Sequence, residues 1–164
     1  HGLPLLILED LLKKETDKSP KFFRVIGDSR LFMDLHKRFK FEMQEYFHPL
    51  AFVSEIAKIG EGVMVGPFAV LAGECRVGDG CYINYQSQMG SQSEVGKYVH
   101  LAPHACLQDG AVVLDGAQLG MGASVLKGVT VGEGCVIGSN AVVTKDVPAG
   151  ETWAGVPARK LGPK

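Results

Sequence analysis

Residues 107–131 read LQDGAVVLDGAQLGMGASVLKGVTV, and an aliphatic side chain returns at every sixth position from Leu107 to Val131. The same series runs without an insertion from Val53 to Val143, and Ile, Leu, Val or Met fills every position. A period of six fits neither the 3.6 residues per turn of an α-helix nor the seven-residue repeat of a coiled coil. Three short extended segments joined by tight turns do fit it, because together they make a triangular coil of 18 residues with the aliphatic side chains inside. The repeat predicts a mainly β structure built as a parallel β-helix.

Glycine marks the turns between these segments, since it adopts positive φ without a steric penalty. The residue two places before each aliphatic position is small, and glycine precedes that small residue in many repeats. This turn position instead holds Gln86, Gln92, Tyr98 and His104 in four successive repeats, and returns to glycine in the five that follow. A local rule that is broken over consecutive repeats indicates where functional side chains lie.

The charges of the chain are nearly balanced. Its 164 residues include 17 basic and 18 acidic side chains, and the formal charge is -1, which provides no field to attract nucleic acid or an anionic membrane. The sequence has no apolar run of 18 residues and no basic leader followed by an apolar stretch, so we expect a cytoplasmic protein without a membrane partner. The 4 cysteines form no CxxC pair and no cluster with histidine, which argues against a metal site or a disulfide scaffold.

Residues 1–48 differ from the repeat because they hold most of the phenylalanines and few glycines. We expect short strands in LPLLI (residues 3–7) and FFRVI (residues 22–26), and helices in EDLLKK (residues 9–14) and SRLFMDLHKRF (residues 29–39). Asp28 or Ser29 is placed to cap the second helix. Alternating strands and helices predict a small parallel α/β unit before the β-helix.

The whole pattern resembles the hexapeptide-repeat acyltransferases, whose fold is a left-handed parallel β-helix and whose members are usually homotrimers. VIGDSRL, and then HPLAFVSEIAKIGEGV, is similar to the IGDN turn and the HPSA entry to the first coil of the NeuD-like nucleotide-sugar acyltransferases. The resemblance implies a partial, Rossmann-like acceptor-side subdomain in residues 1–48 and a left-handed β-helix with a C-terminal closing segment in residues 49–164. The family's opening strand and its Gly-rich nucleotide loop would lie before His1.

The activity that this resemblance implies is transfer of an acetyl or related acyl group from acetyl-CoA to an amino or hydroxyl group of a sugar or nucleotide-sugar, without a metal. The alternative is a catalytically degenerate β-helix trimer that serves as a CoA-binding, sugar-binding or assembly module. His100 and His104 also resemble part of the three-histidine zinc site of β-helical carbonic anhydrases, but the repeat holds no third histidine to complete it.

The segment INYQSQMGSQSEVGKYVHLAP (residues 83–103) is similar to the family segment that carries a catalytic His-Asp/Glu-Cys triplet and a second His nine residues later. Asn84 matches the family's INTG motif, Ser91 falls on the catalytic His, and Gln92 falls on the adjacent carboxylate. A serine hydroxyl is no general base near neutral pH, whereas an imidazole with a pKa near 6.5 is. His100 matches the second His, which in the family contacts the acyl-CoA near the reacting centre, and it is the best substitute base.

Three mechanisms therefore stay open for the transfer site. The chain is an inactive member that still binds CoA or a sugar, or it uses a base other than Ser91, or it acylates a nucleophile that is already neutral. In the third case, positioning of the reactants supplies most of the rate.

The donor side of the family's site is present in the sequence. GMGAS and IGSNA match the turns along which acyl-CoA lies in the family, and AGVPARKLG matches its C-terminal motif. The resemblance implies cofactor-binding roles for His100, Gly120, Met121, Gly138, Ser139, Arg159 and Lys160. The two basic residues would meet the phosphates of CoA. On the acceptor side the candidates are Asp28, Ser29 and Arg30, for which the alternative is a helix cap beside a surface arginine.

Overall fold

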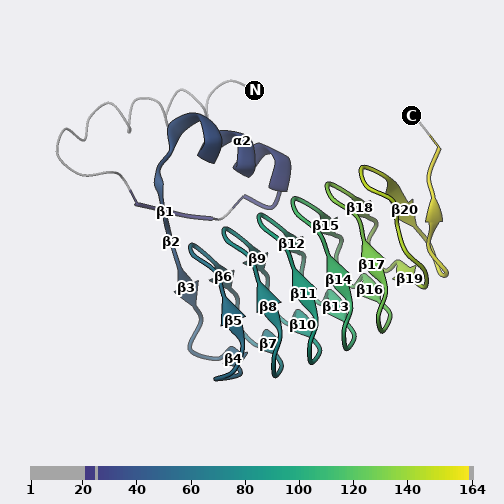
Figure 1. The fold of residues 1–164 in the computed structure, drawn as a ribbon, viewed down its shortest axis with the longest axis horizontal. Helices are drawn as coiled ribbons and strands as arrows, with labels where there is room; N and C mark the ends of the chain where they lie inside the picture. The colour runs from purple at the N-terminus through teal and green to yellow at the C-terminus, as the bar shows by residue number, and fades with distance from the viewer. Residues whose placement is uncertain (1–20, 25, 163–164) are drawn as a thin grey trace.

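The computed structural model describes residues 21–24 and 26–162, which form a three-sided prism of stacked coils with one helix along its side (Figure 1). Every aliphatic position of the repeat from Val53 to Val143 is the second residue of a two-residue strand. Strands 18 residues apart pair in parallel, as in the pairing of His100 with Gln118. The predicted left-handed parallel β-helix of 18-residue coils is confirmed.

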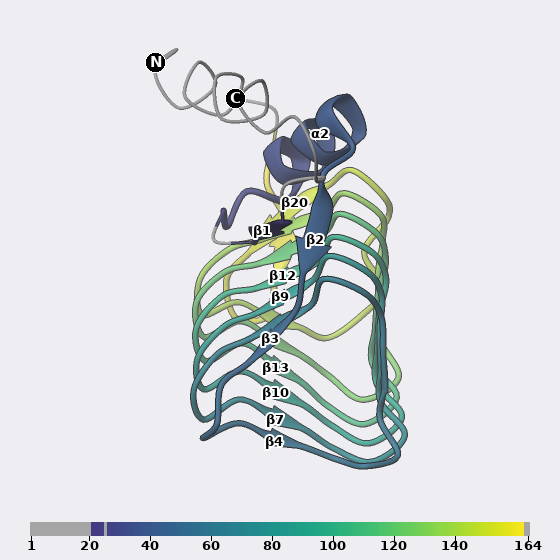
Figure 2. The same cartoon turned by 90° about the vertical axis from the view of Figure 1, so that its left-hand side faces the viewer.

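Three parallel sheets form the faces of the prism, and Figure 2 shows their triangular arrangement. The six-stranded face contains β4 (Phe52–Val53), β7 (Val70–Leu71), β10 (Gln88–Met89), β13 (Cys106–Leu107), β16 (Ser124–Val125) and β19 (Val142–Val143). The five-stranded face contains β5 (Lys58–Ile59), β8 (Arg76–Val77), β11 (Glu94–Val95), β14 (Val112–Val113) and β17 (Thr130–Val131). The eight-stranded face contains β3 (Tyr46–Phe47), β6 (Met64–Val65), β9 (Tyr82–Ile83), β12 (His100–Leu101), β15 (Gln118–Leu119), β18 (Val136–Ile137), β20 (Thr152–Ala154) and the antiparallel β21 (Arg159–Lys160).

The core of the prism is the stack of aliphatic side chains that the repeat predicts. From Val65 to Val143 these side chains are buried, whereas Val53 and Ile59 in the first coil are half-buried. Burial of one such side chain stabilises the fold by about 1.5–3 kcal/mol. Where the small inward position is a serine, its hydroxyl donates to a backbone carbonyl, as Ser87 does to Ala102 at 3.1 Å, so no buried hydroxyl is left unsatisfied at these sites.

Three corners join the faces, and after the first coil most turns have one residue with positive φ. The helix corner joins the five- and eight-stranded faces through turns at Gly62, Gly80, Tyr98, Gly116 and Gly134. The groove corner joins the eight- and six-stranded faces through turns at Phe68, Gln86, His104, Gly122 and Asn140. The triplet corner joins the six- and five-stranded faces through turns at Glu74, Gln92, Gly110 and Gly128. The four successive residues that replace glycine between residues 86 and 104 are thus distributed over all three corners.

A small α/β unit precedes the coils. The helix α2 (Ser29–Phe39) has the predicted limits, and the Asp28 carboxylate caps it by accepting from the Leu31 N–H at 3.0 Å. The strands β1 (Lys21–Phe23) and β2 (Glu42–Gln44) pair in parallel on either side of it in sequence, which confirms a parallel α/β arrangement. No helix in the described part of the chain has the length and apolar character needed to span a membrane.

The strand predicted in FFRVI is only partly correct. It ends at Phe23, whose side chain is 51% exposed, and the buried side chain of this run is Arg24, which is 1% exposed. The Arg24 guanidinium donates hydrogen bonds to backbone carbonyls and to the Ser29 hydroxyl, which explains why this charged residue rather than Phe23 faces inward. The strand predicted in LPLLI and the helix predicted in EDLLKK lie outside the described residues.

The helix α2 lies on the helix corner, which is seen end-on in Figure 2. The Tyr98 hydroxyl lies 2.9 Å from Nδ1 of His36, and the Tyr98 ring is 6.3 Å from that of Phe32. Tyr98 adopts φ 57° at a corner position where the other described coils have glycine. The contacts of its ring with α2 account for this departure from the glycine rule.

Candidate functional site

A shallow cavity of about 350 Å³ lies on the eight-stranded face beside the groove corner. Five of the residues predicted for the site line it: Asp28, His100, Gly120, Met121 and Ser139. Because they come from the start of α2 and from three coils, the fold brings together residues that are more than a hundred positions apart in the sequence. We call this cavity the groove.

His100 is held between two groups at the end of the groove nearest α2. Its ring stacks on that of Tyr82 one coil below, with centroids 5.2 Å apart and planes inclined by 14°. On the other side the Gly27 backbone approaches so closely that a Cβ there would lie 2.9 Å from Cε1 of the imidazole. The His100 Nε2 atom is buried and has no hydrogen-bond partner within the described residues.

The surroundings of His100 keep its imidazole neutral. Burial lowers the pKa of His100 to about 4, the positive charge of Arg24 acts in the same direction, and a backbone hydrogen bond with Gly27 opposes both. A neutral imidazole with this pKa accepts a hydrogen bond through its unprotonated nitrogen but holds a proton poorly at neutral pH. An unsatisfied buried nitrogen that lines a cavity indicates a hydrogen-bonding partner that a ligand would supply.

The glycines predicted to bind the cofactor have a structural role as well. A Cβ at Gly120 would lie 2.6 Å from the backbone nitrogen of Ser139, and a Cβ at Gly138 would lie 2.9 Å from the Cβ of Ala154. Stacking of successive coils therefore requires both glycines, whatever they bind. Met121 adds a large apolar side chain, 51% exposed, to the groove lining.

Arg159 and Lys160 form β21, at the end of the face that carries the groove. Both side chains are exposed, and Lys160 pairs with Glu151 at 2.5 Å. This pairing lowers the pKa of Glu151, and the Glu151 carboxylate also accepts from the Trp153 indole at 2.8 Å. Arg159 donates only to the adjacent Ala158 carbonyl among the hydrogen bonds at this end. Of the two cations, Arg159 is the one whose charge is not neutralised by a carboxylate contact here.

Ser91 and Gln92 lie at the triplet corner, away from the groove. Both are exposed, the Ser91 N–H donates to Asp109 Oδ1 at 3.0 Å, and Gln92 Nε2 donates to Glu74 Oε2 at 2.8 Å. This corner joins the two faces that do not carry His100. Within one chain the structure therefore does not bring the predicted triplet position and His100 together.

Asn84 and His104 belong to the groove corner. The Asn84 side chain accepts from the N–H of Tyr85 at 2.8 Å, so it stabilises its own turn. The Tyr85 ring meets that of His104 edge-on, with centroids 6.0 Å apart. Neither residue lines the groove, and the contacts of both are with Tyr85 in the same corner.

The three acceptor-side candidates are separated by the fold. Asp28 lines the groove while it caps α2. Ser29 is buried and accepts from Arg24 at 2.9 Å, and Arg30 donates to the Gly134 carbonyl at 2.9 Å on the helix corner. The cap expected as the alternative is observed, but it does not exclude Asp28 from the groove, because a carboxylate can accept several hydrogen bonds at once.

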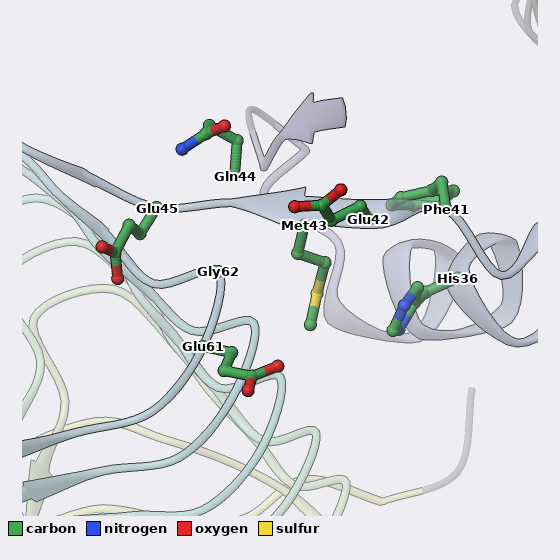
Figure 3. A pocket seen from close by; sticks show the side chains of 8 residues that line it. All are labelled: His36, Phe41, Glu42, Met43, Gln44, Glu45, Glu61 and Gly62. Carbon is green, nitrogen blue, oxygen red and sulfur yellow. The ribbon is translucent and has the colours of Figure 1, made fainter. Parts of the chain in front are cut away.

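A second cavity, of about 460 Å³, lies between α2, β2 and the turn at Glu61 and Gly62 (Figure 3). In Figure 3 the side chains of His36 and Met43 lie on the side of β2 that faces this turn, whereas Gln44 points the opposite way. Several glutamates line this cavity, but none of the residues predicted for the site does. Among the described residues, no group of three His, Cys, Asp or Glu side chains is arranged to hold a metal ion.

Sequence reasoning missed Arg24, Gly27, Tyr82 and Gln118, of which the last three surround His100 or line the groove. Tyr82 and Gln118 lie 18 residues before and after His100, so the coil length alone would have placed them next to it. A charged residue inside the apolar run FFRVI was the available signal for Arg24.

The family model for bacterial transferase hexapeptide proteins (six repeats) matches residues 56–89 and 110–145. No curated protein sequence matches the chain significantly. Many solved structures match it, and three similar ones come from different bacteria.

A mutant of perosamine N-acetyltransferase from Caulobacter crescentus, solved in complex with CoA and GDP-perosamine, is 32% identical, with a TM-score of 0.84 over 99% of this chain and 75% of that chain. The acetyltransferase domain of PglB from Neisseria gonorrhoeae, which has also been solved with acetyl coenzyme A, is 28% identical, with a TM-score of 0.87 over 93% of this chain and 77% of that one. WeeI from Acinetobacter baumannii is 27% identical, with a TM-score of 0.84 over 94% of this chain and 76% of that chain.

Proposed function

Because this chain belongs to the hexapeptide-repeat transferases, we propose that it transfers an acetyl or related acyl group from acyl-CoA to an amino or hydroxyl group of a sugar or nucleotide-sugar. The observation that carries the proposal is the groove, where His100, Gly120, Met121 and Ser139 come together with Asp28. Similar proteins of known structure were solved with CoA and GDP-perosamine or with acetyl coenzyme A, which supports both the donor and the sugar acceptor.

In the proposed reaction the acceptor nitrogen or oxygen bonds to the thioester carbonyl carbon, and the C–S bond breaks. CoA leaves with the electron pair, and the proton of the acceptor N–H or O–H passes to the sulfur. A base with a pKa near 7 is not available at His100, because burial lowers the pKa of its imidazole to about 4. We therefore favour a nucleophile that arrives neutral and is oriented in the groove, where positioning supplies most of the rate.

The NeuD-like assignment belongs to this proposal, with residues 1–48 on the acceptor side and residues 49–164 carrying the transfer site. Ser91 and Gln92 would occupy the family's catalytic positions, Asn84 its adjoining motif, and Arg159 and Lys160 would meet CoA phosphates. A homotrimer is also part of the proposal, because the triplet corner of one copy would then adjoin the groove of the next. We predict a cytoplasmic setting for the reaction.

One observation favours a second candidate, a binding or assembly module without turnover. The Ser91 N–H donates to Asp109 and the Gln92 side chain donates to Glu74, each 18 residues along the prism. Contacts of this kind hold stacked coils together and do not require that the residues bind a substrate. A chain of this kind would keep the groove and bind CoA without transferring its acyl group.

The test combines CoA binding, measured by calorimetry, with thiol release from acetyl-CoA in the presence of amino sugars and UDP- or GDP-linked amino sugars. Transfer that falls strongly in His100→Ala, in a variant that keeps the thermal stability of the unaltered protein, would support the proposed site. Binding of CoA without thiol release, and no gain in the double variant Ser91→His with Gln92→Glu, would favour the module. Absence of CoA binding would overturn the donor site altogether.

A further inference from the structure

Arg24 is the only charged side chain that is buried in the part of the chain that the structure describes. A buried guanidinium is costly unless hydrogen bonds satisfy it. Arg24 donates its hydrogen bonds mainly to backbone carbonyls rather than to a carboxylate. Its role is therefore not that of a salt-bridge partner.

The partners of Arg24 join two parts of the protein. From the segment before α2, the Ile26 carbonyl accepts from Nε at 3.3 Å and the Ser29 hydroxyl accepts from a terminal nitrogen at 2.9 Å. From the coils, the Val99 carbonyl accepts at 3.1 Å, and the Gly80 carbonyl accepts from the same nitrogen. The guanidinium thereby ties residues 26–29 to the coil that contains His100, which follows Val99 directly.

The tie determines what covers His100. Gly27 lies within the tethered segment, and its backbone is in contact with the imidazole. The charged and titratable groups near the ring are Arg24 and Asp28 from this segment and Tyr82 from β9. The hydrogen bond with Gly27 engages one ring nitrogen, and Nε2 is buried without a hydrogen-bond partner among the described residues.

We propose that Arg24 is a positioning residue of the transfer site, which anchors residues 26–29 over His100 so that Nε2 faces the groove as a hydrogen-bond acceptor for the attacking N–H or O–H. This inference rests on the proposed function for its substrate, but the coupling between Arg24 and His100 is independent of it. The arrangement selects an uncharged acceptor, since a neutral imidazole beside a buried guanidinium orients an N–H without drawing a proton from an ammonium group.

The first test is NMR titration of the His100 imidazole in the full chain and in Arg24→Met. Removal of the nearby positive charge and loosening of the Gly27 segment are expected to raise the pKa of His100 from about 4 by about one unit or more. Arg30→Met is the matched control, because Arg30 also ties the α/β unit to a coil carbonyl, at Gly134, but lies on the helix corner. It should leave the His100 titration unchanged.

Arg24→Lys separates charge from geometry and keeps the test decisive if Arg24→Met does not fold. Lysine retains the charge but lacks the planar fork that reaches four acceptors, so a positioning role predicts an upward shift for it as well. A second readout is acyl transfer, in which kcat should fall about tenfold or more through misplacement of His100, while the affinity for CoA changes less.

An unchanged His100 titration in folded Arg24→Met or Arg24→Lys would overturn the inference, even if both variants lose thermal stability. If the titration shifts but the unaltered protein transfers no acyl group, the coupling stands and the proposed function, with the role of Nε2 in it, is refuted. The two failures are thus distinguishable.

Discussion

Acid should destabilise this protein partly through His100, and replacing that residue by glutamine should remove this part. The folded chain keeps the imidazole neutral down to a pKa of about 4, whereas the unfolded chain takes up a proton below the usual pKa of about 6.5. The unfolded state therefore binds more protons between these values, and stability falls as the pH decreases through this window. The contribution of His100 is fully present above pH 6.5.

The size of the effect follows from the two pKa values. Integration of the linkage relation between pH 7.5 and pH 5 gives a loss of about 2 kcal/mol for the wild-type chain, approaching about 3 kcal/mol near pH 4. Carboxylates and the other histidines contribute equally to both proteins, so they cancel in the comparison with His100→Gln. The difference between the free energies of unfolding should change by about 2 kcal/mol across this pH range.

Urea unfolding can be followed through Trp153, the only tryptophan of the chain, which is 6% exposed in β20. Titrations at pH 7.5, 6 and 5 on both proteins give the required differences. Parallel losses of stability in the two proteins would refute the reasoning, because they would mean that His100 has the same proton affinity in the folded and unfolded states.

Three further predictions concern the prism and its ends. Tyr98→Gly relieves the positive φ but removes the contact with His36, so amide exchange in α2 should accelerate while exchange in the coils stays slow. Leu119→Ala, in the fully buried stack, should lower the free energy of unfolding by about 2–5 kcal/mol in denaturant titrations. Arg159→Ala should weaken binding of CoA in calorimetry more than Lys160→Ala does, because the ammonium of Lys160 already pairs with a carboxylate.

The β-helix could be predicted from the sequence because the side chains that fill its core are aliphatic and recur at a fixed spacing. Every coil contributes an aliphatic side chain to the same stack, so a single exception would leave a cavity, and the sixteen positions from Val53 to Val143 reveal the coil length. The helix α2 was also predictable, since Asp28 caps it and its ends are local features. The tie made by Arg24 was not, because its acceptors at Gly80 and Val99 are remote in sequence and are backbone atoms, which leave no mark on residue type.

The positions of the residues expected on the donor side were easier to predict than the proton affinity of His100. The family resemblance pointed to Gly120 and Ser139, and both line the same cavity as His100. The neutral state of His100 depends on burial by Gly27 and on the charge of Arg24, both contributed by the α/β unit. The repeat alone therefore predicts where the imidazole lies but not its pKa. The pKa decides whether this imidazole acts as a base or as a hydrogen-bond acceptor.

The broken glycine rule is a weaker sign of chemistry than the sequence indicates. Positive φ in a residue other than glycine costs about 1 kcal/mol, and the structure shows what offsets that cost at three of the four positions. Tyr98 docks α2, Gln92 donates to Glu74 one coil below, and His104 meets the ring of Tyr85. Phe68 and Glu74 break the rule as well, outside the stretch from residue 86 to residue 104. The corners of a β-helix stack coil upon coil, so side chains at a corner contact side chains in the neighbouring coils. A polar atom left without such a partner is the stronger sign of a ligand, and Nε2 of His100 on the eight-stranded face is such an atom among the described residues.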